Sequence, residues 1–284
     1  MLGYGIGGLM VESSDPVISR RIAMHHREMD SFGFFESQKA LEVAPVTVLA
    51  TDQPAGTTFP PHAHSSGQLI YAISGVMIVR SAAGSWIVPT GRAVWVPGGV
   101  RHEIEIASDV QMRTVYVVAD ARDTLPDSCR VILVGALLRE LILTAVGIRP
   151  VAGYEGREQR VLDLILDEIC VAEPLLLHVP MPRHPALVEL CTELITQPSL
   201  DATLQGWARR ANMNPRTFAR AFQRETGMTH GSWCRHTRVL LSLPQLATGA
   251  SVLDVALEHG YDSPSAFTAM FRKVLGVAPS EYFK

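Results

Sequence analysis

Hydrophobic and polar residues alternate in short runs through the first half of the chain, from Val43 to Val118. Runs such as GQLIYAIS, GVMIVRS, RAVWVPGG and HEIEIAS are separated by segments that contain glycine or proline. A period of two predicts strands with one buried face, and short strands with frequent turns are typical of a small barrel or jelly roll. The sequence therefore predicts a β-barrel over residues 43–120, preceded by an N-terminal arm over residues 1–42.

Beyond residue 120 the apolar positions recur with a helical period. Val131 to Val146 and Val161 to Val171 each carry one apolar stripe, which predicts two amphipathic helices within a helical segment, 121–172. The proline-rich stretch 173–185 is typical of an interdomain linker. The remaining residues, 186–284, read as helical throughout. The expected fold class is α+β in two domains, a barrel followed by an all-α domain.

One segment of the all-α domain occurs twice. NPRTFARAF, which begins at Asn214 and is followed by Gly227, recurs as SPSAFTAMF, which begins at Ser263 and is followed by Gly276, an offset of 49 residues. In each copy Asn or Ser can cap a helix, proline takes the first helical position, and two phenylalanines share one buried face. The glycine then ends the helix.

Each copy follows a shorter helical pattern. Leu204 to Ala211 has the helical period, and Ser251 to Asp254 resembles a capping box that opens a helix ending at Gly260. A helix, a short turn and a capped helix form a helix-turn-helix unit. One copy alone could be an ordinary helical hairpin, but two copies in register favour a pair of such units.

Charge supports this interpretation only locally. The formal net charge is −3, yet seven arginines lie between Gln205 and Leu240 against one acid, Glu225. Such an excess attracts DNA through counterion release. A solvated basic helix face is the alternative, which would be preferred if no motif lay there. The arginines are Arg209, Arg210, Arg216, Arg220, Arg224, Arg235 and Arg238.

The cellular location follows from what the chain lacks. Its four cysteines are scattered, which predicts buried thiols in a reducing cytoplasm rather than disulfides. No secretory signal opens the sequence, and Val131 to Val146 is too short and too charged to span a bilayer. We expect a cytoplasmic protein with no membrane partner.

The stretches WARRANMNPRTFARAFQRETGM and SVLDVALEHGYDSPSAFTAMFRKVLGVAPSEYF, with Arg238 between them, resemble the DNA-binding domain of the AraC/XylS family over about residues 185–284. The resemblance implies a seven-helix domain whose two recognition helices enter successive major-groove segments, and a spacing of about 34 Å suits such a reader. The residues it places at the DNA are Asn214, Arg216, Thr217, Ala219, Arg220, Ser263, Ser265, Thr268, Ala269 and Arg272.

These positions carry different expectations. Arg216 and Arg220 can each bond guanine bidentately, whereas Thr217 suits a phosphate. Ala269 stands where some family members have a long polar side chain, so the second helix is expected mainly to position the protein. Pro244 departs from the family's linker helix and predicts a kink there, at a cost of about 3 kcal/mol.

Two spaced sets of residues in the predicted barrel resemble the cupin signatures. They read Gly56-x5-His62-x-His64-x3-Gln68-x6-Gly75 and Gly91-x5-Pro97-x-Gly99-x2-His102-x3-Ile106. The resemblance implies that His62, His64 and His102 meet inside the barrel with Gln68 as their neighbour. Tyr71 is a further candidate for effector contact.

A metal is one interpretation of these histidines, because three neutral imidazoles can hold Zn²⁺ or another divalent ion with one position open. Gln68 stands where the cupin pattern has glutamate and Ile106 where it has asparagine, and both departures weaken that interpretation. The other interpretation is that the histidines line a polar effector pocket or bond to strand backbone.

The function that these features favour is a ligand-responsive transcription regulator rather than an enzyme. Expected partners are promoter or operator DNA, a small-molecule effector and a second copy of the chain, with RNA polymerase as a further candidate. Activation and repression both remain open. The alternative is a metal-dependent cupin enzyme of dioxygenase or isomerase type, for which Glu103 and Glu105 are the nearest carboxylates in sequence. A general DNA-packaging protein fits poorly with an acidic chain.

Overall fold

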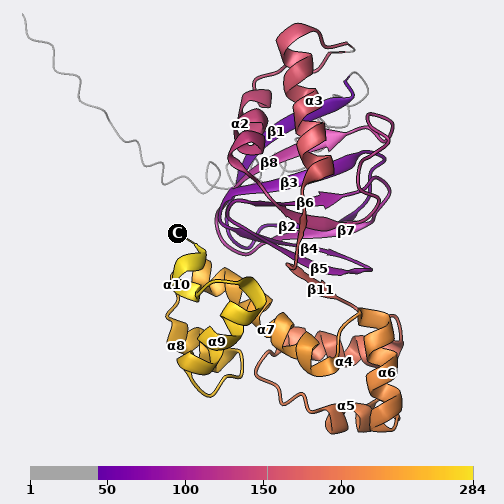
Figure 1. Ribbon diagram of the computed structural model, residues 1–284, viewed down its shortest axis with the longest axis vertical. Coiled ribbons are helices and arrows are strands. Elements are labelled where there is room, and N and C mark those ends of the chain that lie inside the picture. Colours follow the sequence, from indigo (N-terminus) through magenta and orange to yellow (C-terminus); the bar gives the residue numbers. More distant parts are fainter. Residues whose placement is uncertain (1–43, 152, 284) are drawn as a thin grey trace, which may run out of the picture.

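A computed structural model describes residues 44–151 and 153–283 of the protein. The N-terminal arm expected over residues 1–42 lies outside these residues. Two antiparallel sheets form the upper domain in Figure 1, and a bundle of short helices forms the lower one. The expected α+β class with two domains is therefore confirmed. No helix in the described part of the chain is long and apolar enough to cross a membrane.

The barrel is built from two antiparallel sheets. The first sheet has the order β1 (Val46–Gln53), β8 (Val110–Val117), β3 (Gly67–Ser74), β6 (Arg92–Val96), β9 (Arg130–Leu133) and β10 (Pro174–Leu175). The second sheet has the order β11 (His178–Pro180), β5 (Gly84–Pro89), β4 (Val76–Ser81), β7 (His102–Ile106) and β2 (Thr58–His62).

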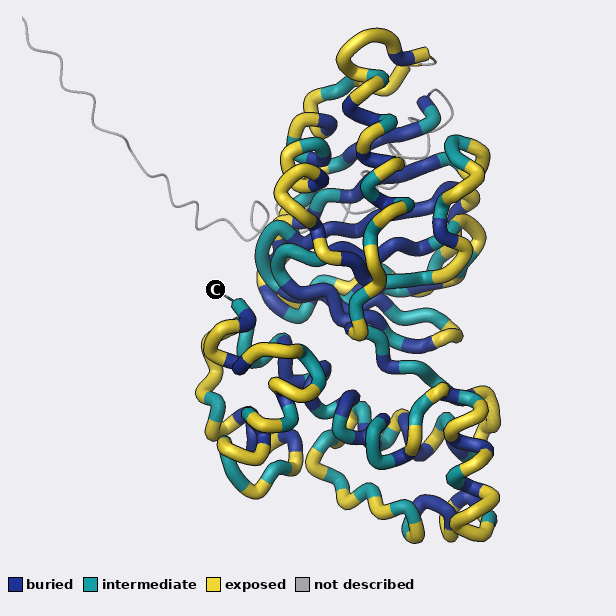
Figure 2. The backbone as a smooth tube through the Cα atoms, in the orientation of Figure 1, coloured by how far each residue is buried: buried dark blue, intermediate teal, exposed yellow. Residues whose placement is uncertain are grey.

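The pleat of each strand divides its side chains between two environments. In β3, Ile70 and Ala72 point into the core between the sheets, whereas Leu69 and Tyr71 point to the outer face of the first sheet. Figure 2 shows the buried residues as dark blue tube along the strands. Alternate side chains of the first sheet therefore lie in the core between the two sheets and on the outer face of the first sheet, which the helices cover.

Two helices cover the outer face of the first sheet. They are α2 (Ala136–Ala145) and α3 (Gly156–Val171), and their buried leucines and isoleucines pack on the outward side chains of the strands. The prediction of a helix from Val131 onward was wrong for its first residues, because Val131 and Ile132 belong to β9. Both residues are β-branched and both are buried, which suits a central strand.

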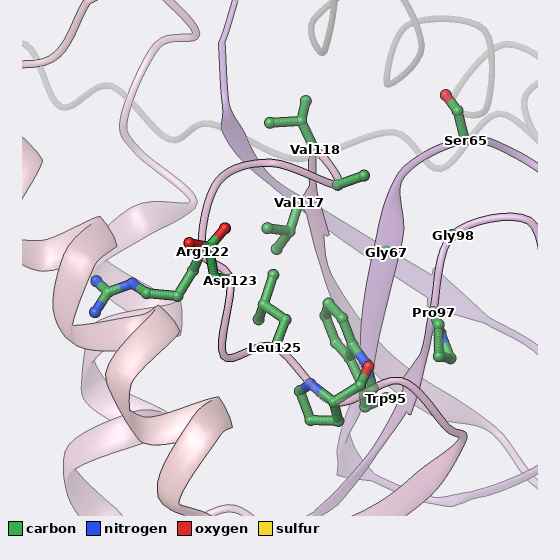
Figure 3. A pocket seen from close by; sticks show the side chains of 12 residues that line it. Ser65, Gly67, Trp95, Pro97, Gly98, Val117, Val118, Arg122, Asp123 and Leu125 are labelled. Carbon is green, nitrogen blue, oxygen red and sulfur yellow. The ribbon is translucent and has the colours of Figure 1, made fainter.

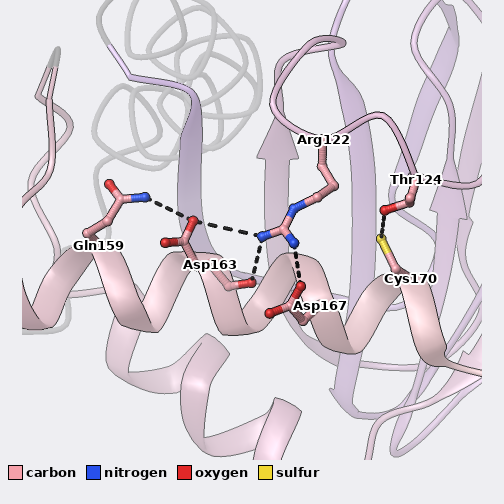
Figure 4. Close-up of polar contacts among 6 residues, drawn as sticks. All are labelled: Arg122, Thr124, Gln159, Asp163, Asp167 and Cys170. Atoms are coloured by element: carbon pink, nitrogen blue, oxygen red, sulfur yellow. Dashed lines mark hydrogen bonds and ion pairs between the residues drawn. The ribbon is translucent and has the colours of Figure 1, made fainter.

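A salt bridge fastens the loop after β8 to α3. The Arg122 guanidinium lies 2.5 Å from a carboxylate oxygen of Asp167 and 3.9 Å from one of Asp163, as Figure 4 shows. Thr124 Oγ1 lies 3.3 Å from Cys170 Sγ in the next turn of the helix. The loop is therefore held against α3 at two points.

The segment 173–185 is more ordered than a linker. It contains β10, which pairs with β9, and β11, which pairs with β5. Both are edge strands, where proline is tolerated because an edge residue can leave its missing N–H on the open side. Pro174 and Pro180 therefore lie in short strands that extend the two sheets, whereas Pro182 follows β11 and Pro185 begins the next helix.

The helical domain contains seven helices in the described residues. They are α4 (Pro185–Thr196), α5 (Leu204–Arg210), α6 (Pro215–Thr226), α7 (His230–Ala247), α8 (Val252–Glu258), α9 (Pro264–Leu275) and α10 (Pro279–Tyr282). In Figure 1, α7 lies between the group that contains α6 and the group that contains α9. Helix α7 continues through Pro244 without a break and ends at Ala247.

The two domains touch along α7. Trp233 Nε1 donates a hydrogen bond to the carbonyl of Pro180 at 2.7 Å, and His236 Nε2 lies 2.9 Å from the carbonyl of His178. Both carbonyls belong to β11, the edge strand of the second sheet. The helix that joins the two helix-turn-helix units is therefore clamped to the barrel.

Candidate DNA-binding surface and effector site

Helix α6 has the geometry expected of a recognition helix. Asn214 caps it, because its side-chain oxygen accepts a hydrogen bond from the backbone N–H of Thr217 at 2.9 Å. Phe218 and Phe222 are completely buried against Trp207 of α5, whereas Arg216 and Arg220 are exposed. The buried and exposed faces are thus set by the i, i+4 spacing read from the sequence.

Helix α9 repeats this arrangement. Ser263 caps it by accepting a hydrogen bond from Ala266 N at 3.2 Å, and Phe267 and Phe271 are completely buried. Both helices end at a glycine with positive φ, Gly227 at 74° and Gly276 at 83°. The outward positions differ in chemistry from those of α6, since they offer fewer long polar side chains.

The structure places the predicted DNA-facing residues of both helices on accessible surface. Ser265, Ala269 and Arg272 are exposed, and Ala219 and Thr268 are half-buried at matching positions. Among the described residues, no ion pair involves Arg216 or Arg220. Both guanidinium groups are therefore available for an anionic ligand.

The basic patch is narrower than the sequence suggests, because some arginines support the fold. Arg238 donates hydrogen bonds at 2.8 Å to the carbonyls of Pro198 and Leu200. Arg210 pairs with Glu193 of α4. Arg235 is half-buried. The contacts of Arg238 and Arg210 join segments that are distant in the sequence, so the local count of arginines could not reveal them.

Gln223 is a candidate that the sequence prediction missed. It is exposed and lies seven residues after Arg216, which places it on the same face of α6. The 49-residue offset maps it onto Arg272, which the prediction included. The internal repeat was therefore the signal that could have identified it.

The three barrel histidines lie together, as the cupin resemblance implies. His62 on β2 pairs in register with His102 on β7, and their ring centroids are 4.4 Å apart. His64 lies 5.4 Å from His102, centroid to centroid. The ligand atoms of the three rings fall within 4.8 Å of one another. His102 and His64 are 1% and 9% exposed.

Gln68 closes this cluster from the first sheet. Its Oε1 lies 3.1 Å from His64 Nε2 and 3.1 Å from His102 Nε2. Its Nε2 donates to Tyr116 Oη at 3.2 Å. Burial lowers the pKa of His64, and it lowers the pKa of His102 to about 4. At neutral pH both rings are therefore uncharged.

Tyr71 does not join this cluster, so its contact with an effector stays a prediction that the histidine cluster does not support. It is three residues from Gln68 in the same strand, so its side chain points to the opposite face of the sheet, among the residues covered by α2 and α3. Tyr116 lies at the cluster where Tyr71 was expected, because Tyr116 pairs with Gln68 across β3 and β8. Only the strand register, which the sequence does not reveal, identifies that pair.

The carboxylates considered for an enzyme lie outside the barrel. Glu103 and Glu105 alternate with His102, Ile104 and Ile106, which point inward. On the outer face, the guanidinium of Arg80 lies 3.7 Å from Glu103 and 2.6 Å from Glu105. Neither carboxylate therefore faces the histidine cluster.

A cavity of about 390 Å³ lies beside the strand ends of the first sheet. Figure 3 shows the Trp95 indole at its floor and the loop that carries Leu125 at its side. Trp95 Nε1 donates to the carbonyl of Pro126 at 2.8 Å. The cavity also borders Ser65 and Gly67, which lie in the segment between His64 and Gln68. It is separate from the histidine cluster but shares that loop.

Comparison with known proteins agrees with this two-part arrangement. Residues 45–168 match the family model described as an AraC-like ligand binding domain, and residues 207–284 match a helix-turn-helix domain model. The HTH-type transcriptional regulator NimR of Escherichia coli is 32% identical over 231 residues, which cover 80% of this chain and 84% of NimR. The regulator RipA of Corynebacterium glutamicum is 26% identical over 218 residues, which cover 77% of this chain and 62% of RipA. Among solved structures, ToxT of Vibrio cholerae covers 84% of this chain and 97% of its own, at 12% identity and a TM-score of 0.35.

Proposed function

Because the chain belongs to the AraC family of HTH-type transcriptional regulators, we propose that α6 and α9 read two successive major-groove segments of a promoter. The observation that carries this proposal is the duplicated, capped helix whose phenylalanines are buried and whose polar face is open in both copies. Phosphate contacts would supply most of the affinity and base contacts the specificity.

In this proposal α6 makes most of the contacts that recognise DNA bases. Arg216 and Arg220 each bond guanine O6 and N7, and Gln223 on the same face suits adenine N6 and N7. Asn214 and Thr217 lie at the N-terminus of the helix, where backbone N–H groups and a hydroxyl suit a phosphate.

The second unit specifies less. Ser265, Thr268 and Ala269 are short, and Ser263 is occupied as a cap, so only Arg272 offers a long donor on this face. We therefore assign α9 mainly to holding the protein in register on the DNA.

The barrel is the proposed sensor, with an effector at His62, His64, His102 and Gln68. One cross-strand row links this cluster to the DNA-binding domain: His62 pairs with His102, His102 with Ser81, Ser81 with Gly84, and Gly84 with Pro180. The carbonyl of Pro180 accepts the hydrogen bond from α7. A shift of this row on effector binding would move the helix that sets the angle between the two units.

Two protein partners complete the proposal. A second copy of the chain would bind to the exposed apolar face of α2 and α3, where Leu137 and Leu164 are 54% and 43% exposed. RNA polymerase is assigned to α8, where Leu253 and Leu257 are 51% and 53% exposed. Leu137→Glu should then give a monomer in analytical ultracentrifugation, and Leu253→Ala should reduce transcription in vitro without weakening DNA binding. A cupin enzyme has less support, because the carboxylates nearest in sequence face away from the histidines.

The test is a fluorescence-anisotropy titration of the purified protein against a promoter fragment from upstream of its own gene. Arg216→Ala and Arg220→Ala should each weaken specific binding by about 1–3 kcal/mol, with less effect on random DNA. Arg157→Ala, which removes the same charge from an exposed position on α3, is the matched control. Equal affinity of the wild type for promoter and random DNA at moderate salt would contradict specific recognition.

A further inference from the structure

The last turn of α6 is bonded to the chain segment that leaves the barrel. One carboxylate oxygen of Glu225, Oε2, accepts hydrogen bonds at 2.9 Å from the backbone N–H groups of Arg183 and His184. These two residues stand directly before Pro185, the first residue of α4. The hydrogen bond from the His184 N–H, together with the one from Arg183, holds the pKa of Glu225 below its usual range. At neutral pH the acceptor is therefore a carboxylate, which makes both hydrogen bonds charge-assisted.

Every backbone N–H of the segment 181–184 is bonded either to the barrel or to α6. Met181 N donates at 3.3 Å to the carbonyl of Ala83, in the turn between β4 and β5. Pro182 has no N–H and fixes its own φ, and the next two N–H groups donate to Glu225. The segment is therefore a short and stiff connection that is bonded to the barrel at one end and to α6 at the other.

This connection distinguishes the first helix-turn-helix unit from the second. Glu225 lies in the same helix as Arg216 and Arg220, whose side chains are on the exposed face. The 49-residue offset maps Glu225 onto Val274 of α9, and a valine side chain cannot accept a hydrogen bond. The two recognition helices therefore share their caps and their buried phenylalanines, but the side chain that bonds α6 to the segment 181–184 has no polar counterpart in the repeat.

We propose that Glu225 is a positioning residue for base recognition, because its two hydrogen bonds fix the alignment of α6 relative to the barrel and with it the placement of Arg216 and Arg220. The inference rests on the proposed role of α6 as a reader of bases. A bidentate bond between arginine and guanine needs both groups aligned, whereas contacts to phosphates carry no sequence information. Loss of the Glu225 bonds should therefore reduce discrimination at the bases read by α6 more than it reduces affinity for DNA in general.

The test compares full-length Glu225→Ala with the wild type on the promoter fragment and on two derivatives of it. In one derivative the guanines contacted by α6 are replaced, and in the other those contacted by α9. The guanines contacted by α6 are those whose recognition is lost in the double variant Arg216→Ala, Arg220→Ala. For each derivative, fluorescence anisotropy gives the factor by which the replacement weakens binding. In Glu225→Ala we expect the factor for the α6 guanines to fall about tenfold, while the factor for the α9 guanines stays as in the wild type.

Two further variants separate positioning from charge and from folding. Glu225→Gln keeps an oxygen that can accept from both N–H groups but removes the charge, so its factor for the α6 guanines should lie between those of Glu225→Ala and the wild type. Glu189→Ala removes the same charge from an exposed position on α4 and should behave as the wild type. Circular dichroism and a stoichiometric DNA titration give the folded and active fraction of each variant. If Glu225→Ala fails to fold, the smaller decrease expected for Glu225→Gln still decides the test.

Three outcomes would overturn the proposal. An unchanged factor for the α6 guanines in folded Glu225→Ala would leave Glu225 with a structural role only. Equal decreases for the α6 and α9 guanines would show that the bonds do not act on α6 in particular. A decrease in Glu189→Ala as large as that in Glu225→Ala would assign the effect to charge. If the wild type prefers the promoter and any of these results is obtained, only this inference fails, whereas a wild type without that preference would count against the proposed function itself.

Discussion

Acidification should destabilise the first helix-turn-helix unit through His230, at the start of α7. Its side chain is 6% exposed, lies 4.7 Å from the Trp207 ring and is surrounded by aromatic rings. Burial lowers the pKa of His230 to about 4. In the unfolded chain the ring binds a proton near pH 6.5, so the folded state binds fewer protons between these two values. Its contribution to stability is therefore complete above pH 6.5 and is lost as the pH falls toward 4.

The magnitude follows from the two pKa values. One pKa unit corresponds to about 1.4 kcal/mol, so the loss from this side chain should be about 2 kcal/mol at pH 5 and about 3 kcal/mol at pH 4. Urea unfolding at pH 7 and pH 5, followed by tryptophan fluorescence, measures it. His230→Phe cannot be protonated and should lose about 2 kcal/mol less than the wild type between these pH values. His184→Gln, at an exposed position, is the control. An equal loss in His230→Phe and the wild type would refute this reasoning.

Three further substitutions test the roles assigned by the structure. Arg238→Ala removes two hydrogen bonds to backbone carbonyls and should lower the free energy of unfolding by about 2 kcal/mol in urea titrations, leaving the preference for promoter over random DNA unchanged. Gly75→Ala should lower the thermal midpoint more than Gly91→Ala, because both glycines have positive φ but only at Gly75 would a Cβ lie 2.1 Å from a backbone oxygen, that of Asp109. Trp233→Phe keeps the ring but removes the donor to β11, so it should cost about 1 kcal/mol and separate the unfolding of the two domains in calorimetry.

The parts of the fold that the sequence predicted are those specified by local chemistry. The repeat contains its own caps and end glycines, so Asn214, Ser263, Gly227 and Gly276 could be assigned without knowledge of their neighbours. The strands of the barrel follow from the period of two. The histidine cluster came from a resemblance, since the residues that meet are far apart in the sequence.

The parts that the sequence did not predict depend on contacts between distant segments. In the sequence, Arg238 counts as part of the basic patch, and only its hydrogen bonds to two distant backbone carbonyls show that it supports the fold. Tyr116 enters the site only through the register of β3 and β8. The strands in segment 173–185 form because two sheet edges are available to them. Tyr71 is different, because its odd separation from Gln68 would have excluded it from the site once a strand was assumed.

Guanine-methylation interference on the bound promoter fragment tests the central claim most directly, because it detects contacts to N7 in the major groove. If α6 and α9 both read the major groove, methylation should interfere with binding at two clusters of guanines about one helical turn, roughly 10 base pairs, apart on one face of the DNA. Interference at guanines of the cluster read by α6 should disappear in the double variant Arg216→Ala, Arg220→Ala, while the second cluster remains. A single cluster, clusters on opposite faces, or an unchanged pattern in the double variant would contradict the assignment of α6 and α9 as paired readers.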